Sequence, residues 1–293
     1  MFQEILPILF CPCCHGKLHL QNERRECEEI ISGEFVCSCG KQYYIRDGIA
    51  DFGSHEQENI NTWSEYYQQD SYEKLDQKME SNKSKNQQCI EQKFLQAITD
   101  QTLKLKTGTL LDIASGRGIL LKKLIKTTGS EVHIIATDLS FQVLRYDRIK
   151  LKMQEPERHI NFIACDATQL PVQSGVIDMV STFVGFVNMG NLAESGIKDA
   201  ARVLKPNAKL INSCIYLHED TLGFQNLKQF FSENGIAGAE TFLLEQGVRD
   251  IHKKYFSDIS NQIVYEGIAE PSIDDLIPCA GEWFADAVVT AIK

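Results

Sequence analysis

The stretch Leu110-Leu111-Asp112-Ile113-Ala114-Ser115-Gly116-Arg117-Gly118 decides the fold of this chain. It is typical of a buried strand that runs into a glycine-rich turn, and the periodicity of Gly118–Thr128 then predicts a helix. Gly116 and Gly118 permit backbone conformations and close approaches that other residues resist. Open α/β sheets bind ligands at the carboxyl ends of their strands, so this D-x-x-x-G-x-G turn is a candidate cofactor site.

Two more acids follow at the ends of later predicted strands. Asp138 ends the apolar run Ile134–Asp138, twenty residues after Gly118, and a carboxylate there can accept both hydroxyls of a ribose. Asp166 ends the next run and can accept an adenine amine, while the N–H of Ala167 can donate to the ring. A single such acid is more often a cap of a helix or turn. Three in order favour a site for an adenosine-containing cofactor.

The region 107–293 alternates short apolar runs with amphipathic stretches, a pattern that predicts a parallel sheet with crossover helices. The predicted strands are Thr109–Ala114, Val132–Asp138, Ile160–Cys165, Val176–Phe183, Lys209–Tyr216 and Trp283–Ile292. The predicted helices between them are Gly118–Thr128, Ser140–Met153 and Leu192–Leu204.

These features resemble the class I methyltransferase family, and the resemblance covers roughly Thr109 to Lys293. It implies a Rossmann-like α/β sheet with helices on both faces and S-adenosyl-L-methionine as cofactor. Ala114 stands where many members have glycine, and Asn207-Ala208 replaces the usual Gly-Gly after Pro206. The resemblance implies cofactor contacts from Asp112, Ala114, Gly116, Gly118, Asp138, Leu139, Asp166, Ala167 and Phe183.

Six of the ten cysteines lie within the first 39 residues, in two close groups that suit a tetrahedral zinc site. A dense cluster in a protein of the reducing cytosol favours metal over disulfides. The segment Gly40–Ile49 resembles small zinc-ribbon modules ending in C-G-x-x-Y-P-I-x-D-G-I-P. Some of those are partner subunits of methyltransferases, and others are fused to methyltransferases, including rRNA guanine enzymes.

That resemblance implies a structural Zn²⁺ held by Cys11, Cys14, Cys37 and Cys39, since four protein ligands leave no open position for chemistry. The second pair is C-x-C rather than C-x-x-C, which leaves open whether Cys39 completes the site. The alternatives for that ligand are Cys13, Cys27 and His15. A ribbon that keeps reduced cysteines and no metal is the competing interpretation.

We therefore expect three regions: a zinc ribbon over 1–53, a helical linker and cofactor lid over 54–106, and the Rossmann-like domain over 107–293. Residues 218–238 and 252–281 exceed a minimal core, and we expect substrate-recognition insertions there. Aromatic residues of the linker could close over a cofactor or simply pack. They are Trp63, Tyr66, Tyr67 and Tyr72.

The acceptor side carries no diagnostic catalytic motif. The N/D-P-P-Y/F tetrad that grips planar amines is absent after Asp178, and the segment 181–188 looks more like small-molecule enzymes. Methyl transfer from a sulfonium depends largely on positioning, and a base is needed only for a hydroxyl or carbon acid. His218 and Asn188 are the weak candidates, and a solvated loop histidine is the commoner outcome.

The chain has a net charge of −10 and no basic stripe in its sequence, so we expect a nucleic-acid partner to be less favoured. No segment has the apolar length of a membrane span, and the first ten residues do not read as a signal peptide, so we expect a cytoplasmic protein. The leading hypothesis is methylation of a small molecule. There are two alternatives. One is an rRNA or tRNA methyltransferase guided by the ribbon, and the other is a non-catalytic scaffold.

Overall fold

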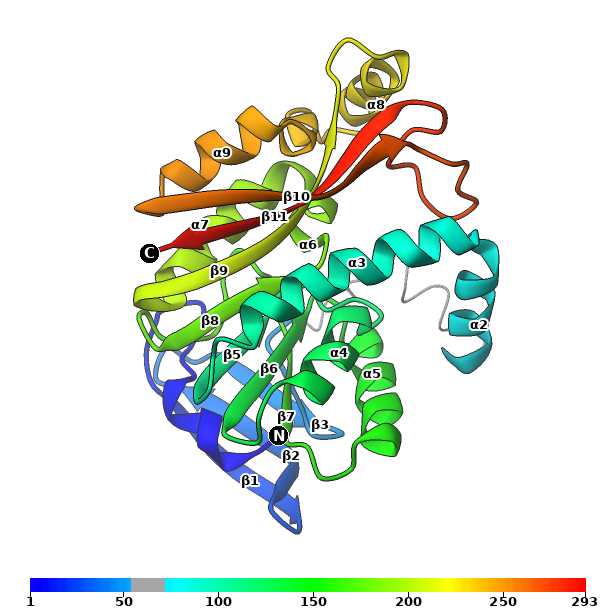
Figure 1. Cartoon of the computed structure of the whole chain (residues 1–293). Coiled ribbons are helices and arrows are strands. Elements are labelled where there is room, and N and C mark those ends of the chain that lie inside the picture. Colours follow the sequence, from blue (N-terminus) through cyan, green and yellow to red (C-terminus); the bar gives the residue numbers. More distant parts are fainter. Residues whose placement is uncertain (54–71) are drawn as a thin grey trace.

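The computed structural model describes residues 1–53 and 72–293. Its described strands form one sheet in the order β1-β2-β3-β4-β7-β6-β5-β8-β9-β11-β10 (Figure 1). The central strands run parallel and β11 runs against them. Their bounds are β5 Gly108–Asp112, β6 Val132–Asp138, β7 Ile160–Ala164, β8 Ile177–Thr182, β9 Leu204–Leu217 and β11 Trp283–Ile292. This arrangement confirms the predicted Rossmann-like sheet.

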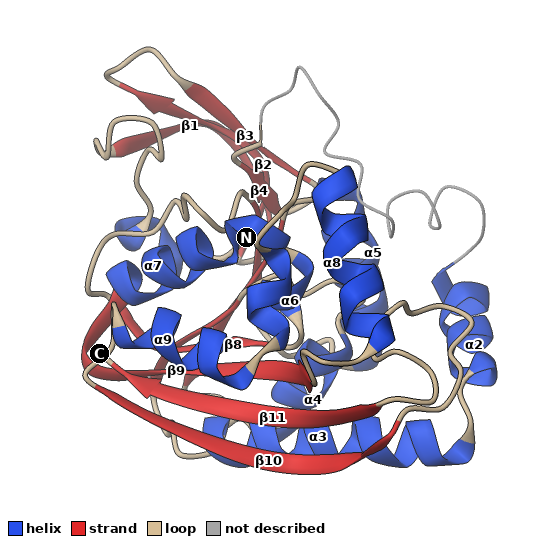
Figure 2. Ribbon diagram, turned by 90° about the horizontal axis from the view of Figure 1, so that it is seen from above, coloured by secondary structure: helices blue, strands red, loops and turns tan. Residues whose placement is uncertain are grey.

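Helices cover both faces of the sheet. On one face lie α3 (Lys85–Thr102), α4 (Ile119–Thr127) and α5 (Phe141–Gln154), which bury apolar side chains against Leu110, Ile134 and Phe162. On the other lie α7 (Ala193–Val203) and α9 (Glu245–Lys253), as Figure 2 shows from above. The remaining described helices are η1 Gln3–Ile8, α2 Tyr72–Asn82, α6 Gly185–Asn188, η2 Gly190–Leu192, α8 Leu222–Glu233 and η3 Ala239–Leu243.

Local sequence explains where these elements begin. Strands β5 to β8 are covered on both sides, so they read as nearly continuous apolar runs rather than alternating ones. Helix α4 starts at Gly118, whose φ of 69° is in the left-handed region that favours glycine. Helix α5 starts at Ser140, whose hydroxyl accepts the N–H of Val143 over 3.3 Å. Both starts lie directly above the carboxyl edge of the sheet.

The cysteine-rich module is continuous with the main sheet rather than a separate appendage. It contains β1 (Leu18–Glu26), β2 (Glu29–Cys37), β3 (Gln42–Arg46) and β4 (Ile49–Asp51). Strand β4 pairs in parallel with β7, and Asp51 lies opposite Ala164. The apolar side chains of the module join the same buried cluster as those of β7 and α7. The module therefore extends the edge of the sheet on which the candidate cofactor residues lie.

The prediction of an insertion over 252–281 is wrong for residues 258–268, which belong to the sheet. Residues Asp258–Ile268 form strand β10, which pairs antiparallel with β11 along its whole length and ends the sheet. About every second side chain of this edge strand is exposed, and most of the exposed ones are polar, so its sequence carries a weak strand signal. Only the connection after β10 extends beyond the sheet. Among 218–238, helix α8 packs Phe224 and Leu227 beside the top of β9.

Two further expectations concern the region before the Rossmann-like domain. Trp63, Tyr66 and Tyr67 lie outside the described residues, and so does the side chain of Tyr72. The rest of the predicted helical region forms α2 and α3, and α3 begins with a capping box between Ser84 and Gln87. In the described ranges, none of the helices has both the length and the apolar character needed to cross a membrane.

Candidate cofactor edge and metal cluster

Asp112 ends β5 in a buried position below the glycine turn. Its two carboxylate oxygens accept the hydroxyls of Ser181 and Ser115, each over 2.9 Å. Burial raises the pKa of Asp112 to about 7, against the two serine hydrogen bonds, and the nearby Asp138 adds to the rise. The carboxyl is thus rigidly held, and it ties the end of β5 to the end of β8.

Asp138 is held at the end of β6, where the sequence predicts a ribose contact. One carboxylate oxygen accepts the N–H of Gly116 and the other accepts the N–H of Ser140, each over 3.0 Å. These bonds are the capping role considered as the alternative for this acid. A carboxylate oxygen can accept more than one hydrogen bond, so a diol remains compatible with this position. Asp138 therefore joins the glycine turn to the start of α5.

The turn after β5 and the segment after β8 both contain strained backbone. Ala114 has a φ of 54° and Val184 a φ of 57°, and neither residue favours the left-handed region. The two segments lie close together, because a Cβ at Gly185 would come within 2.9 Å of the Ala114 methyl group. Such conformations persist where the surrounding structure demands them, and they concentrate at functional sites. Ala114 thus occupies the glycine conformation of the family.

The remaining predicted cofactor residues lie along the same edge. Asp166 is exposed just after β7, and one of its oxygens accepts the N–H of Thr168 over 2.8 Å. Ala167 follows it and is half-buried. Leu139 directly follows Asp138 and leaves 44% of its surface exposed. Phe183 directly follows β8 and meets the ring of Phe94 from α3 edge-on at 5.4 Å.

An ionic cluster beneath the glycine turn was not predicted from the sequence. The fully buried Asp147 of α5 lies 3.2 Å from Lys150, which also contacts Asp76 of α2 at 3.3 Å. Arg117, within the turn, pairs with the same Asp76 at 3.3 Å. Any Cβ at Gly118 would come within 2.9 Å of the Asp147 carboxylate. The turn therefore packs against a buried carboxylate, and α2 is tied to it by charge.

The module brings the four predicted cysteines together. The Sγ atoms of Cys11, Cys14, Cys37 and Cys39 lie within 4.8 Å of one another. Thiolates around a tetrahedral zinc ion at about 2.3 Å would be roughly 3.8 Å apart, and Cys11 and Cys39 are separated by 3.8 Å. Tyr43 contacts the Cys11 sulfur at 3.3 Å, where its hydroxyl can support a ligand. The donor set fits a closed zinc site.

The alternative ligands lie outside this cluster. Cys13 and Cys27 are exposed, and the ring of His15 stacks on Phe10 with centroids 4.9 Å apart. Gly16 is close to the site, since a Cβ there would lie 3.1 Å from the Cys14 sulfur. The C-x-C spacing of the second pair is therefore accommodated by the turn that follows β2.

The two weak catalytic candidates lie at the surface. His218 is exposed just after β9 and stacks on Trp283 with ring centroids 4.0 Å apart. Asn188 is exposed at the last position of α6, and its N–H donates to the carbonyl of Val184 over 3.2 Å. Each has a local partner that explains its position, and neither is brought into contact with the strand-end acids by a hydrogen bond between described residues.

The module adds residues beside the predicted cofactor edge that sequence reasoning missed. Asp51 ends β4 and pairs with Arg46, whose guanidinium lies 4.5 Å from the ring centroid of Phe141 at the start of α5. Asp51, Asp138 and Asp166 thus follow three neighbouring strand ends. The sequence shows an acid at position 51, but only the pairing of β4 with β7 reveals that this acid lies beside the candidate cofactor edge.

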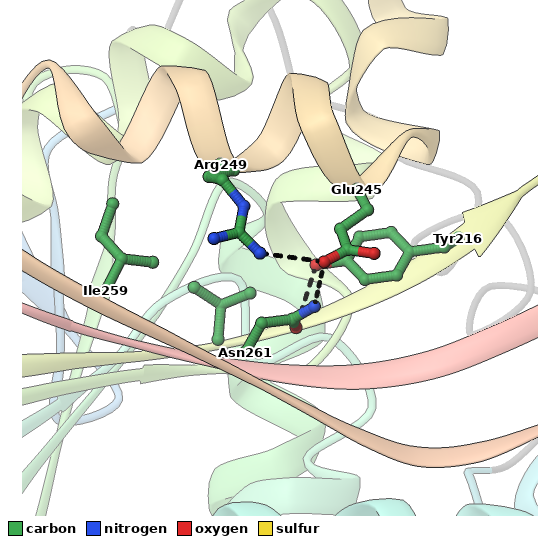
Figure 3. Close-up of a pocket in the computed structure, with 6 residues that line it drawn as sticks. Tyr216, Glu245, Arg249, Ile259 and Asn261 are labelled. Carbon is green, nitrogen blue, oxygen red and sulfur yellow. Dashed lines mark hydrogen bonds and ion pairs between the residues drawn. The ribbon is translucent and has the colours of Figure 1, made fainter.

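Two hollows between described residues lie away from this edge. One is a cavity of about 10 Å³ between α9 and the sheet, at the lower limit for one water molecule (Figure 3). Its polar atoms bond one another: Glu245 accepts from Arg249 and from Asn261, each over 3.0 Å. The other is an open groove of about 390 Å³ between α3 and β10. Because the polar side chains that line the first cavity bond one another, we assign no ligand to it.

Comparisons with known families divide the chain in the same way. Residues 110–207 match the family model described as a methyltransferase domain, and residues 3–48 match the one described as Trm112p-like protein. The chain thus joins a class I methyltransferase domain to an N-terminal Trm112p-like module, as the sequence predicted.

Similar proteins include quinone methyltransferases. A 2-phytyl-1,4-naphtoquinone methyltransferase of Trichormus variabilis is 30% identical over 101 residues, which cover 34% of this chain and 44% of that protein. A ubiquinone/menaquinone biosynthesis C-methyltransferase of Pseudomonas fluorescens is 32% identical over 108 residues, or 36% of this chain and 42% of that protein. The chain spans less than half the length of these curated relatives.

Solved structures share the fold. Phosphoethanolamine N-methyltransferase 2 of Haemonchus contortus, in complex with S-adenosyl-L-methionine, superposes with a TM-score of 0.51 at 17% identity. The match covers 68% of this chain and 52% of that one. A putative methyltransferase of Bacillus halodurans gives a TM-score of 0.50 at 13% identity, covering 67% and 97%. At such identities the likeness concerns the fold alone.

Proposed function

We propose that this protein is an S-adenosyl-L-methionine-dependent methyltransferase that acts on a small-molecule acceptor. The single observation that carries the proposal is the joined unit at the carboxyl edge, in which Asp138 accepts the N–H of Gly116. That bond brings the glycine turn and the second strand-end acid into one site, with Asp166 on the next strand. Ligands of open α/β sheets bind at this edge.

In this proposal the strand-end residues divide the cofactor between them. The turn from Asp112 to Gly118 faces the methionine half, and Asp138 accepts the ribose hydroxyls. Leu139 and Ala167 flank the adenine, whose amine Asp166 accepts. When bound, the cofactor supplies a methyl group on a sulfonium that carries its own leaving group. The task of the protein is then to orient the acceptor in line at the end of β8, beside Phe183.

A small acceptor is favoured over RNA by the charges at the seam between module and domain. The cations of α5 that face the module are paired: Arg145 with Asp47 at 3.0 Å, and Arg148 with Glu29 at 2.8 Å. Arg24 in the β1–β2 hairpin pairs with Glu26 in the same way. Paired cations leave little positive charge for phosphates, whose neutralisation dominates nucleic-acid affinity. The quinone methyltransferases among its relatives support an aromatic acceptor.

We also propose that the module holds one structural Zn²⁺ on Cys11, Cys14, Cys37 and Cys39. The separations of these sulfurs suit tetrahedral coordination, and a fifth position for substrate is lacking in such a set. Reduced thiolates of this kind are typical of a cytoplasmic protein, and we retain that location as part of the proposal. The metal stabilises the turns that precede β1 and follow β2.

Isothermal titration of the zinc-loaded chain with S-adenosyl-L-methionine tests the proposed activity at its first step. We expect saturable one-site binding, and transfer of a labelled methyl group to reduced 2-phytyl-1,4-naphthoquinone as the first acceptor tried. A protein that binds no cofactor would be the scaffold alternative. Transfer to rRNA or tRNA, with none to small aromatic acceptors, would establish the RNA alternative instead.

A further inference from the structure

A buried carboxyl that has no partner among the described residues lies near the end of β9. Asp286 of β11 is 5% exposed, and it has no hydrogen bond or ion pair with any residue of the described ranges. It lies opposite Ile215 of β9 in the antiparallel ladder, two residues from Phe284, which faces Leu217 at the end of β9. Asp286 therefore lies just inside the carboxyl edge of the sheet.

The register relates Asp286 to the proposed methyl-transfer point. Side chains two residues apart in a strand share a face, so Asp286 shares its face with Val288, the partner of Ser213. The Ser213 hydroxyl accepts the N–H of Val184 over 2.6 Å, and Val184 is the strained residue directly after Phe183. Asp286 thus lies about 7 Å further along the strands toward the edge than the group that holds this segment.

The surroundings of Asp286 are apolar and irregular. Ile215 belongs to one buried apolar cluster and Val288 to another, and Val184 packs against both. Strand β10 has a register shift between Ile263 and Tyr265, and Tyr265 lies opposite Asp286. Bulges of this kind re-aim side chains and are frequent beside active sites. The ring of Tyr265 meets that of Phe284 at 5.5 Å, and both residues share the face of the sheet on which Asp286 lies.

The surroundings of Asp286 favour exchange of its carboxyl proton near neutral pH. Burial alone raises the pKa of Asp286 to about 7. The neighbouring strands place Ser213 and Ile215 of β9 and Tyr265 of β10 beside it. The charged residues of α3 that face β10 are Lys93 and Asp100, which line the groove between these two elements. An unpaired buried carboxyl costs stability, so packing does not account for an aspartate at this position.

We propose that Asp286 is the general base of the reaction, which removes the hydroxyl proton from a hydroquinone or phenol that is methylated at a ring carbon. This inference rests on the proposed function and names its acceptor chemistry. The carboxylate takes the proton, and the O–H electron pair moves into the ring. The ring carbon forms the new bond to the methyl carbon while the C–S bond breaks, leaving its electrons on sulfur. Loss of the C–H proton to solvent restores the aromatic ring as a phenolate. The carboxyl returns its proton to the phenolate oxygen, so one proton is released for each methyl group transferred.

The test compares the zinc-loaded full-length chain with its Asp286→Asn variant, using reduced 2-phytyl-1,4-naphthoquinone and labelled S-adenosyl-L-methionine. We expect kcat to fall at least 100-fold in Asp286→Asn while the cofactor Kd stays within twofold. The wild-type rate should rise with pH through about 7, and this rise should vanish in the variant. Asp258→Asn, an exposed acid at the start of the same hairpin, is the matched control and should behave as the wild type.

Four outcomes would each contradict one step of the proposal. A fall of less than threefold in Asp286→Asn overturns the role of the base. Infrared difference titration without acceptor gives an independent readout: a carboxyl band that titrates between about pH 6 and 8 and is missing in Asp286→Asn supports the role, and its absence overturns it. Wild-type protein that fails to bind the cofactor overturns the proposed function instead. Wild-type protein that binds the cofactor but leaves this quinol unmethylated overturns the acceptor chemistry.

Discussion

The backbone N–H of Gly116 donates to the carboxylate of Asp138 over 3.0 Å, so the turn after β5 and the acid after β6 form a single structure. The other oxygen of that carboxylate accepts the N–H of Ser140, at the cap of α5. A ligand bound to Asp138 is therefore coupled to the position of the glycine turn. The same acid serves both the architecture of the edge and the proposed ribose contact.

Replacing Asp138 by alanine should weaken the binding of S-adenosyl-L-methionine by about 1–3 kcal/mol, because the ribose hydroxyls and two backbone N–H groups lose their acceptor. Asp138→Asn keeps one oxygen and should lose less. Titration calorimetry measures both, and Asp100→Ala on the exposed surface of α3 is the control. Unchanged affinity in Asp138→Ala would count against the placement of the ribose.

Gly118→Ala should destabilise the fold by about 2 kcal/mol or more, since a φ of 69° strains any residue with a Cβ. The added Cβ would also meet the Asp147 carboxylate at 2.9 Å. The matched control is Gly129→Ala, where a Cβ has open space around it. Chemical denaturation compares the two midpoints, and equal midpoints would show that the turn relaxes without cost.

Elemental analysis of the purified chain should find about one zinc per molecule, because a tetrathiolate site binds zinc tightly. Cys37→Ser should lose the metal, since it removes one of four ligands. Cys27→Ser, an exposed thiol outside the cluster, should retain it. Metal-free wild-type protein that stays folded would refute the structural role of the ion.

The seam between module and domain should weaken in acid. Burial alone would raise the pKa of Glu29, but the hydrogen bond from Lys152 and the charge of Arg148 outweigh it and lower the pKa to about 2. A carboxyl with a lowered pKa in the folded state contributes stability that is complete above its unfolded value of about 4.5 and is lost as the pH falls toward 2.

The difference in unfolding midpoint between wild type and Glu29→Gln should accordingly shrink as the pH drops from 5 toward 2. Thermal unfolding over that range measures it, with the exposed neighbour Glu28→Gln as the control that shows little difference at any pH. A difference for Glu29→Gln that is independent of pH would mean that packing, rather than charge, is lost.

Local sequence signals were sufficient to predict the class of fold and the candidate cofactor edge. Leu110–Gly118, Asp138 and Asp166 encode local events, namely where a strand ends and a turn begins, and those signals depend on neighbouring residues alone. The cysteine spacing did the same for the metal cluster, because two short turns each aim two sulfurs at one point.

The way in which the module and the domain share one sheet became clear only from the three-dimensional arrangement. The pairing of β4 with β7 uses main-chain hydrogen bonds, which every sequence can make, so no side-chain pattern announced that the module joins the domain. Strand β10 escaped prediction because half of it faces outward. In the sequence, Asp286 is one of many acids in an acidic region. Its proposed role as a base depends on its burial and on its position opposite β9, which only the folded structure shows.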